Sequence, residues 1–388
     1  MAQPASHTAV DGASPGQIAA FAPAVVAWQA KHGRHHLPWQ RTRHPYHVWL
    51  SEIMLQQTQV TTVLAYFDRF LDQLPTVQAL AAAPQAQVMA LWAGLGYYSR
   101  ARNLHACAQA VVQRFNGEFP STAAALETLP GIGPSTAAAI ASFCFAQPIS
   151  IYDGNVKRVL SRLLAFDGDL SGSAANKQLH AQAQALVAGL YASPQHLAHS
   201  MPRYTQGLMD LGATVCHLTA PLCKQCPVYT LCKASKAGQP TSYPVKSKKI
   251  KRSSERWVLL LLDRGDAVWL AQRGNTGIWG GLQAPLVFAD WALACDWLVT
   301  NGLGALGATP SLLAKLAQPS IKHQLTHKEL FLTPVVLHVP PASATECLVK
   351  CANQHAQEQA AGTWIAKDQV LQAALPAPVK KWLQGQGY

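Results

Sequence analysis

The 388-residue sequence has few charged residues, and acidic residues are the scarcest of these. Asp, Glu, Lys and Arg make up 13% of the chain, with 19 acids against 31 Lys and Arg and a formal net charge of +12. Because hydrophobic residues reach 49%, the composition is that of folded domains and excludes a disordered chain. The positive excess favours a polyanionic partner, although charge alone does not distinguish DNA from RNA or a membrane surface.

Long apolar runs are also missing. None reaches the length of a transmembrane helix, and Met1–Gly16 lacks the basic-then-hydrophobic pattern of a secretory signal. We therefore expect a cytoplasmic protein without membrane association, whose thiols stay reduced. In that compartment nine cysteines indicate a metal centre rather than disulfides. Without coiled-coil heptads, the expected state is a monomer.

Shifts in composition mark the expected domains. Residues 1–17 are small and polar, so we expect them to be disordered. Residues 18–235 form the first domain, since apolar residues begin to recur at helical spacing at Ile18. Residues 236–255 predict a basic linker, either lying along DNA or simply solvated. Residues 256–388 form the second domain, where strand-like and helical runs mix.

The second domain is therefore predicted to have an α+β fold. The expected strands are Trp257–Leu262, Val268–Gln272 and Leu330–His338, and the expected helices are Asp290–Val299 and Lys367–Leu375.

A glycine hairpin stands at the centre of the first domain. Gly131 and Gly133 are two residues apart, a spacing that allows a tight turn with positive φ and leaves backbone amides uncovered. Pro134 suits the first position of the following alanine-rich helix, Ala137–Phe143. The amides and the helix N-terminus would then converge on an anion such as a nucleic-acid phosphate. The alternative is an ordinary turn between helices.

Two acidic residues have neighbours that permit catalysis. Glu52 lies among apolar residues within Tyr46–Phe70, a segment that predicts one or two helices. Such a glutamate is either solvated or held protonated by its apolar surroundings. Asp153 precedes Gly-Asn-Val, so it can cap a helix or face positive charge developing on a sugar. Lys157 and Arg158 follow it and are either solvated or near the reaction.

Two further segments carry binding chemistry. Leu91–Asn103 combines a glycine turn with two tyrosines and two arginines, which can stack on bases and hold phosphates or can simply form a turn between helices. Cys216, Cys223, Cys226 and Cys232 follow the spacing Cys-x6-Cys-x2-Cys-x5-Cys. Zinc sites usually have two Cys-x-x-Cys pairs or added histidines, whereas a [4Fe–4S] cluster accepts four cysteines in an irregular loop. The spacing favours the cluster over zinc.

Together, the hairpin, the Asp153 turn, the cysteine loop and Ser51–Val60 resemble the MutY family of adenine DNA glycosylases. That family belongs to the helix-hairpin-helix, endonuclease III-like superfamily. The resemblance covers about residues 20–235. It implies a multidomain protein whose first domain is an all-α glycosylase in two lobes, with a [4Fe–4S] loop and an active site between the lobes.

The resemblance also implies roles for individual residues. Glu52 would protonate the flipped adenine at N7, Asp153 would stay ionised and stabilise an oxocarbenium-like sugar, and Asn155 would orient the carboxylate or water. Related glycosylase-lyases carry a catalytic lysine where this chain has Ser135, so hydrolysis without strand cutting is expected. The implied DNA contacts are Gln57, Thr58, Leu95, Tyr97, Gly131, Gly133, Ser135, Lys157, Thr326 and His327.

Residues 256–388 resemble the MutT-like, Nudix-fold C-terminal domain of the same family. The resemblance includes the segment Gly277–Leu282 of this chain. Phosphohydrolysis is not expected, because Val287–Val299 lacks the glutamate-rich pattern that holds magnesium. In the family this domain reads 8-oxoguanine opposite adenine through Phe-Ser-His. Here Leu325-Thr326-His327 keeps the hydroxyl and loses the aromatic ring. The implied partner is double-stranded DNA with adenine opposite 8-oxoguanine or guanine.

Three other functions fit parts of the sequence. A redox protein would account for the cysteine loop but has no need of Glu52 or the hairpin. A DNA-binding module without activity would account for the charge but not for both acids. A thymine or oxidised-pyrimidine glycosylase of the same superfamily would account for the first domain but not for the C-terminal domain.

Overall fold

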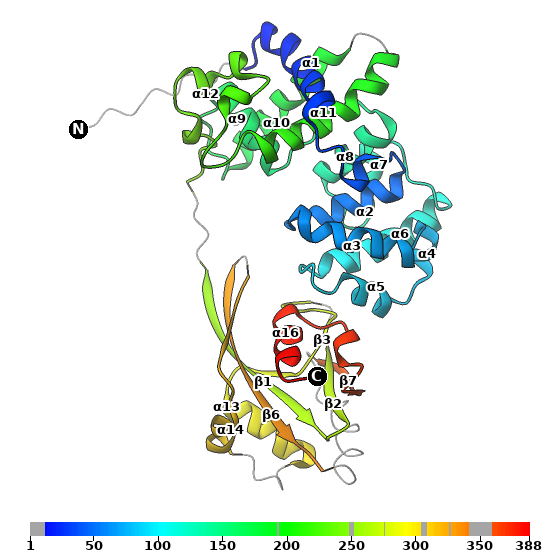
Figure 1. Ribbon diagram of the computed structural model, residues 1–388, viewed down its shortest axis with the longest axis vertical. Helices are drawn as coiled ribbons and strands as arrows, with labels where there is room; N and C mark the ends of the chain where they lie inside the picture. The colour runs from blue at the N-terminus through cyan, green and yellow to red at the C-terminus, as the bar shows by residue number, and fades with distance from the viewer. Residues whose placement is uncertain are drawn as a thin grey trace, which may run out of the picture. The chain divides into compact units, whose positions relative to one another are not determined.

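A computed structural model of the chain is shown in Figure 1. It describes residues 12–191, 194–247, 252–274, 276–303, 309–325, 327–340 and 359–388. Contacts divide the chain into two units. The helical unit comprises Met1–Ala82 and Ala106–Lys249, and the sheet unit comprises Ala83–His105 and Ile250–Tyr388.

Every regular element described in the helical unit is a helix. The α-helices are α1 (Pro15–His32), α2 (Pro45–Leu55), α3 (Val60–Gln73), α4 (Val77–Ala82), α7 (Ala123–Leu126), α8 (Pro134–Phe145), α9 (Gly154–Leu164), α10 (Ser173–Val187), α11 (Pro194–Thr214), α12 (Lys233–Lys236) and the larger part of α6 (Ser99–Phe115). Short 3-10 turns are η1 (Pro38–Gln40), η2 (Ala188–Leu190), η3 (Cys223–Gln225), η4 (Tyr229–Leu231) and η5 (Pro240–Ser242). The all-α prediction for the glycosylase region is confirmed.

Local sequence signals explain where these helices begin and end. Helix α1 starts at Pro15, within the segment expected to be disordered, because Ser14 and Gln17 form a capping box. Residues 1–11 of that segment lie outside the described part of the chain. The segment predicted as one or two helices over Tyr46–Phe70 is two, since the backbone leaves helical geometry at Gln56 and Gln57.

The core of the helical unit anchors α9, the helix that begins after Asp153. Val156, Leu160 and Leu163 are buried among apolar side chains of α1, α10 and α11. Apolar burial contributes roughly 25 cal/mol per Å² of area removed from water, so this face holds α9 firmly in its place. The polar residues in the first turns of α9 are positioned by that packing.

The sheet unit contains a mixed seven-stranded sheet. Its order is β3-β2-β1-β6-β5, with β4 also paired to β1 and β7 to β2. Strands β1 and β6 are neighbours near the middle of the sheet and run parallel, and the other pairs are antiparallel. The strands are β1 (Ser253–Asp263), β2 (Ala267–Arg273), β3 (Gln283–Ala284), β4 (Leu286–Phe288), β5 (Ile321–Gln324), β6 (Lys328–His338) and β7 (Gln359–Ala366).

The sheet unit also contains helices. They are α5 (Gln85–Trp92), the start of α6, α13 (Trp291–Leu298), η6 (Val299–Leu303), α14 (Pro310–Leu316), η8 (Val370–Gln372) and α16 (Ala377–Gly385). Leu298 and Leu313, from α13 and α14, share a buried cluster with Leu260 and Trp269 of the sheet. The prediction of an α+β second domain is confirmed.

One predicted helix of this unit is wrong. The three expected strands lie within β1, β2 and β6, and the helix expected at Asp290–Val299 is α13. Lys367–Leu375, however, contains only the three-residue turn η8. Pro376 follows at once and disfavours helical geometry in the residue before it, while the helix α16 begins beyond it at Ala377. No described helix has both the length and the apolar character needed to cross a membrane.

Candidate active site and cysteine loop

The two predicted catalytic acids both lie in the helical unit. Glu52 is half-buried on α2, between the buried residues Ser51 and Ile53. Asp153 caps α9, and its Oδ1 accepts a hydrogen bond of 2.7 Å from the amide of Val156. Burial, and next the charge of Asp153, raises the pKa of Glu52 to about 8. At neutral pH Glu52 is therefore mostly protonated, and Asp153 lies close enough to influence it.

The position of Glu52 depends on contact between α2 and α8. Gln56, at the end of α2, donates from Nε2 to Oγ1 of the buried Thr136, over 3.2 Å. Burial raises the pKa of the Cys144 thiol of α8 to about 12; the charge of Arg43 acts in the opposite direction, and the charge of Glu52 raises the pKa further. Cys144 thus lies near the carboxyl group.

The hairpin has the predicted form with one correction. Gly131 has φ of 74°, in the left-handed region that favours glycine. Gly133 has φ of −88° and is the N-cap of α8, so the expectation of positive φ is wrong there. A Cβ added at Gly133 would meet nothing within 4 Å, so the missing side chain leaves its backbone open. Pro134 occupies the first turn of α8, as predicted. Ser135 accepts from the amide of Tyr152 at 3.4 Å.

Arg158 connects the first turn of α9 to two other segments. Its Nη2 donates to Oδ1 of Asn155 and to the carbonyl of Gly212, both at 2.8 Å, while Nε donates to the carbonyl of Cys216, also at 2.8 Å. The solvated alternative for Arg158 is therefore wrong. The contacts with Gly212 and Cys216 join residues 54 and 58 positions apart, which no local pattern around Arg158 reveals.

Gly212 packs directly against Asn155. A Cβ added to Gly212 would lie 2.7 Å from Cβ of Asn155, closer than real side chains approach. We expect Gly212→Ala to displace Asn155 and the first turn of α9, and to lower the adenine excision that the resemblance implies by about 100-fold, as misplacements near 1 Å can do. Single-turnover excision by purified variants measures this loss.

Gly16→Ala is the matched control for Gly212→Ala, because a Cβ added to Gly16 meets nothing within 4 Å. It should retain full activity. A Gly212→Ala enzyme as active as the Gly16→Ala enzyme would contradict the positioning of Asn155 by this contact.

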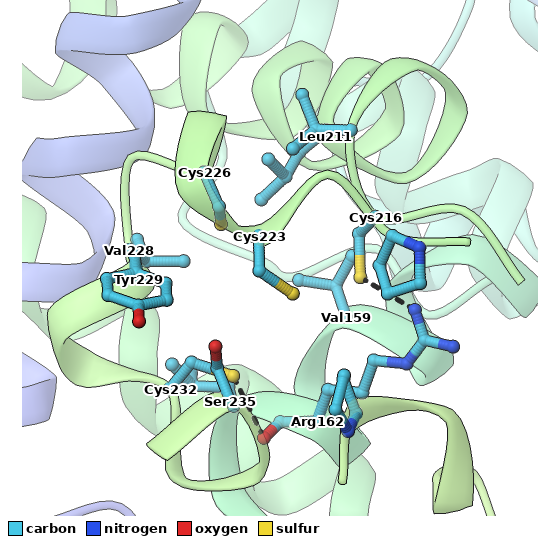
Figure 2. Close-up of a pocket in the computed structure, with 14 residues that line it drawn as sticks. Val159, Arg162, Leu211, Cys216, Cys223, Cys226, Val228, Tyr229, Cys232 and Ser235 are labelled. Atoms are coloured by element: carbon cyan, nitrogen blue, oxygen red, sulfur yellow. Dashed lines mark hydrogen bonds between the residues drawn. The ribbon is translucent and has the colours of Figure 1, made fainter. Parts of the chain in front are cut away.

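The four cysteines of the loop line one pocket (Figure 2). Its remaining walls are mostly apolar, and the cavity has a volume of about 30 Å³. The thiols lie apart around this space rather than about a single point (Figure 2). Accordingly, among the described residues, no group of three His, Cys, Asp or Glu side chains is arranged to hold one metal ion. The apolar and partly apolar lining residues are Val159, Leu163, Leu211, Val215, Pro221, Val228, Tyr229 and Pro240.

Arg162, one turn beyond Arg158, closes the other side of the cysteine pocket. It is buried, and it donates to Sγ of Cys216 at 3.3 Å, to the carbonyl of His217 at 2.6 Å and to that of Leu218 at 2.8 Å. A buried guanidinium with several acceptors holds the loop against α9. Sequence reasoning missed Arg162, because its surrounding pattern is that of an ordinary helix.

Two predicted DNA contacts share an unusual backbone. Gln57 and Tyr97 have φ of 58° and 48°, and both side chains are exposed. Left-handed geometry in residues other than glycine costs about 1 kcal/mol or more and clusters at binding sites. The guanidinium of Arg100 lies 5.6 Å from the centroid of the Tyr97 ring, so the predicted pairing of aromatic and basic groups is present.

The other predicted contacts have different surroundings. Thr58 is half-buried beside Gln57, and Leu95 is buried. His327 is exposed in the turn between β5 and β6, which the amide of Leu325 closes with a 2.8 Å hydrogen bond to the carbonyl of Lys328. Thr326 lies outside the described residues.

The chain matches known families in both of its parts. Residues 50–184 match the HhH-GPD superfamily of base excision DNA repair proteins, and residues 257–385 match the NUDIX domain. An adenine DNA glycosylase from Buchnera aphidicola is 34% identical over 322 residues, covering 81% of this chain and 85% of the relative. The human adenine DNA glycosylase is 44% identical over 227 residues, covering 56% of this chain and 40% of the relative.

A solved thermostable thymine-DNA glycosylase is similar at 24% identity and a TM-score of 0.48, covering 57% of this chain and 98% of that one. The match to the Buchnera aphidicola protein extends across both units and most of the relative. The chain therefore belongs to the adenine DNA glycosylase family, and it is a DNA glycosylase of base excision repair that removes adenine.

Proposed function

We propose that this enzyme hydrolyses the N-glycosidic bond of adenine opposite 8-oxoguanine or guanine, with Glu52 as general acid and Asp153 as the ionised partner. The observation that carries this proposal is the electrostatic coupling of the two carboxyl groups, which helps to raise the pKa of Glu52 to about 8. Two acids kept in different protonation states are typical of bond cleavage that needs a proton donor and a stabilising charge.

Each acid has a separate task in the proposed reaction. The target adenine must leave the base stack before any side chain can reach it. Neutral Glu52 then donates its proton to N7, which makes adenine a better leaving group. As the glycosidic bond breaks, positive charge develops on the sugar, and the carboxylate of Asp153 stabilises it. Asn155, held through Arg158, orients the carboxylate or the attacking water.

Water is the proposed final acceptor of the sugar. Ser135 stands where related lyases have lysine, and its hydroxyl accepts from the backbone of Tyr152. A hydroxyl in that position cannot form a Schiff base. The product is therefore an abasic site in an uncut strand, which breaks only after treatment with alkali.

The raised pKa of Glu52 predicts the pH dependence. Glu52 donates a proton only in its neutral form, which predominates below its pKa of about 8. Excision should therefore be constant below that value and fall as pH rises through it, by about tenfold per unit. Single-turnover rates on a duplex with adenine opposite 8-oxoguanine measure the profile. A rate that stays constant to pH 9.5 would remove the role of Glu52 as acid.

We also propose that Cys216, Cys223, Cys226 and Cys232 hold a [4Fe–4S] cluster. Four thiols on one loop, apolar walls and the Arg162 guanidinium beside Cys216 Sγ fit the ligands and hydrogen bonds of such a cluster. Their separation around the pocket suits a group larger than a single ion. When bound, the cluster would tie the loop together and supply redox-active iron.

Metal analysis tests the cluster directly. Protein purified without oxygen should contain iron and acid-labile sulfide in equal amounts, about four of each per chain, and little zinc. Replacing Cys223 with serine should lower both contents. One equivalent of zinc without sulfide would overturn the proposal in favour of the zinc alternative.

The sheet unit is proposed to read the base opposite adenine. The exposed turn with His327 is the candidate contact, and the protein is proposed to act as a monomer. Duplexes with adenine opposite 8-oxoguanine, guanine or thymine test the whole proposal. We expect alkali-dependent cleavage at adenine in the first two only. Equal cleavage of the adenine–thymine duplex, or cleavage without alkali, would contradict it.

A further inference from the structure

The ring of Tyr152, the residue before the Asp153 turn, contacts a lysine and a histidine. The ammonium of Lys157 lies 4.6 Å from the centroid of its ring. The imidazole of His180, on α10, stacks on the ring with centroids 4.8 Å apart and planes at 25°. The backbone amide of Tyr152 is also bonded to Ser135. The ring is thus fixed by two other segments while it contacts the lysine.

The ring face, rather than the hydroxyl, makes these contacts. The Tyr152 hydroxyl is buried and has no hydrogen-bond partner among the described residues. A cation within about 6 Å of an aromatic centroid is attracted to the ring, which also favours the charged over the neutral form of an amine. Tyr152 therefore acts on Lys157 through a contact that phenylalanine would preserve and leucine would remove.

The amine of Lys157 belongs to the same helix that Asp153 caps. Lys157 follows Asp153 by one helical turn, and its amide donates to the Asp153 carbonyl at 2.9 Å. Burial, and next the charge of Lys246, lowers the pKa of Lys157, whereas Asp153 acts in the opposite direction. The ammonium group of Lys157 is thus more readily deprotonated than that of a free lysine. The neutral amine that results can attack an aldehyde.

The abasic product contains such an aldehyde in its ring-opened form. Nζ of Lys157 would add to C1′ to give a carbinolamine, and loss of one water would form the C=N bond of a Schiff base. Hydrolysis returns the amine and the aldehyde. This side reaction competes with release of the product, and it needs the amine both neutral and free to move.

We propose that Tyr152 is a positioning residue that retains the Lys157 amine against its ring and so limits capture of the abasic product. This inference rests on the proposed function, because it takes the abasic site to form beside Asp153. It concerns the fate of the product and leaves the bond-breaking step unchanged. The stacked His180 would serve by keeping the ring in place.

Borohydride trapping tests the proposal. Sodium borohydride reduces the Schiff base to a stable secondary amine, so the fraction of protein cross-linked to DNA reports capture. The full chain is used with a duplex that contains an abasic site made beforehand by removal of uracil. We expect Tyr152→Leu to increase the trapped fraction about five-fold, the ratio that corresponds to losing one exposed cation–π contact.

Three further variants make the result specific. Tyr152→Phe keeps the ring and should trap as little as the unaltered protein. Tyr152→Leu combined with Lys157→Ala should lose the increase, since the reacting amine is gone. His180→Ala should increase trapping less than Tyr152→Leu does, and it replaces that variant as the test if Tyr152→Leu does not fold.

Two outcomes would overturn the proposal. Trapping by Tyr152→Leu that equals trapping by Tyr152→Phe would exclude retention by the ring, and an increase that persists without Lys157 would assign capture to another amine. Because the abasic site is made beforehand, these outcomes do not depend on adenine excision. Failure of the proposed function would appear instead as intact adenine in the mispaired duplexes.

Discussion

Replacing Glu52 with glutamine is expected to lower single-turnover adenine excision by about 1,000-fold, within the range for removal of a general acid. Glutamine has nearly the same shape but cannot donate a proton to N7. Because Glu52 is mostly neutral at pH 7, the substitution changes little of the charge that DNA meets. Affinity for a mispaired duplex should therefore stay within about two-fold. Quenched-flow excision and equilibrium binding measure the two quantities.

Glu118→Gln provides the matched control, since Glu118 is exposed in the same helical unit. It should excise adenine at the unaltered rate. A Glu52→Gln enzyme that keeps a tenth or more of the activity would show that the proton comes from elsewhere. Equal loss of excision and of DNA affinity would assign Glu52 to binding instead.

Replacing Asp153 with asparagine is expected to lower excision by about 100- to 1,000-fold, as removal of one stabilising group from a transition state does. Asparagine caps helices as well as aspartate does, and its oxygen can still accept from the amide of Val156. The variant should therefore unfold at nearly the same temperature. Loss of the negative charge also lowers the pKa of Glu52. The fall of the remaining activity with rising pH should therefore begin at a lower pH than in the unaltered protein.

Asp290→Asn tests the assumption about capping. Asp290 caps α13 in the same way, accepting from the amide of Leu293 at 2.9 Å, and it lies in the sheet unit. Both asparagine variants should show similar, small changes in unfolding temperature, and only Asp153→Asn should lose activity. A large drop in the stability of Asp153→Asn would mean that its loss of activity reports a damaged helix.

Short-range sequence patterns predicted most of the features that depend on neighbouring residues, such as turns and helix starts. Gly131 and Pro134 indicated the hairpin, and apolar neighbours left Glu52 either solvated or protonated, because turn geometry and burial depend on adjacent residues. The error at Lys367–Leu375 is also local, since Pro376 ends helical geometry there and precedes α16. Strands β1, β2 and β6 were found, whereas the parallel pairing of β1 with β6 joins residues too far apart to predict locally.

The contacts around α9 could not be predicted for the same reason. Arg158 and Arg162 reach carbonyl groups more than 50 positions away, and their partners are backbone atoms that carry no signature in the sequence. Tyr152 and Cys144 are ordinary core residues by pattern, and only the fold brings them beside Lys157 and Glu52. The motif residues were thus predictable, and the residues that support them were not.

The cap formed by Asp153 separates what folding requires from what the reaction requires within one side chain. Folding uses one oxygen as an acceptor for Val156, whereas the proposed reaction uses the negative charge. A screen for thermal stability or soluble expression would therefore accept Asp153→Asn as harmless. For this position, the fitness of a variant has to be judged from turnover on DNA, since abundance and melting temperature do not register the loss.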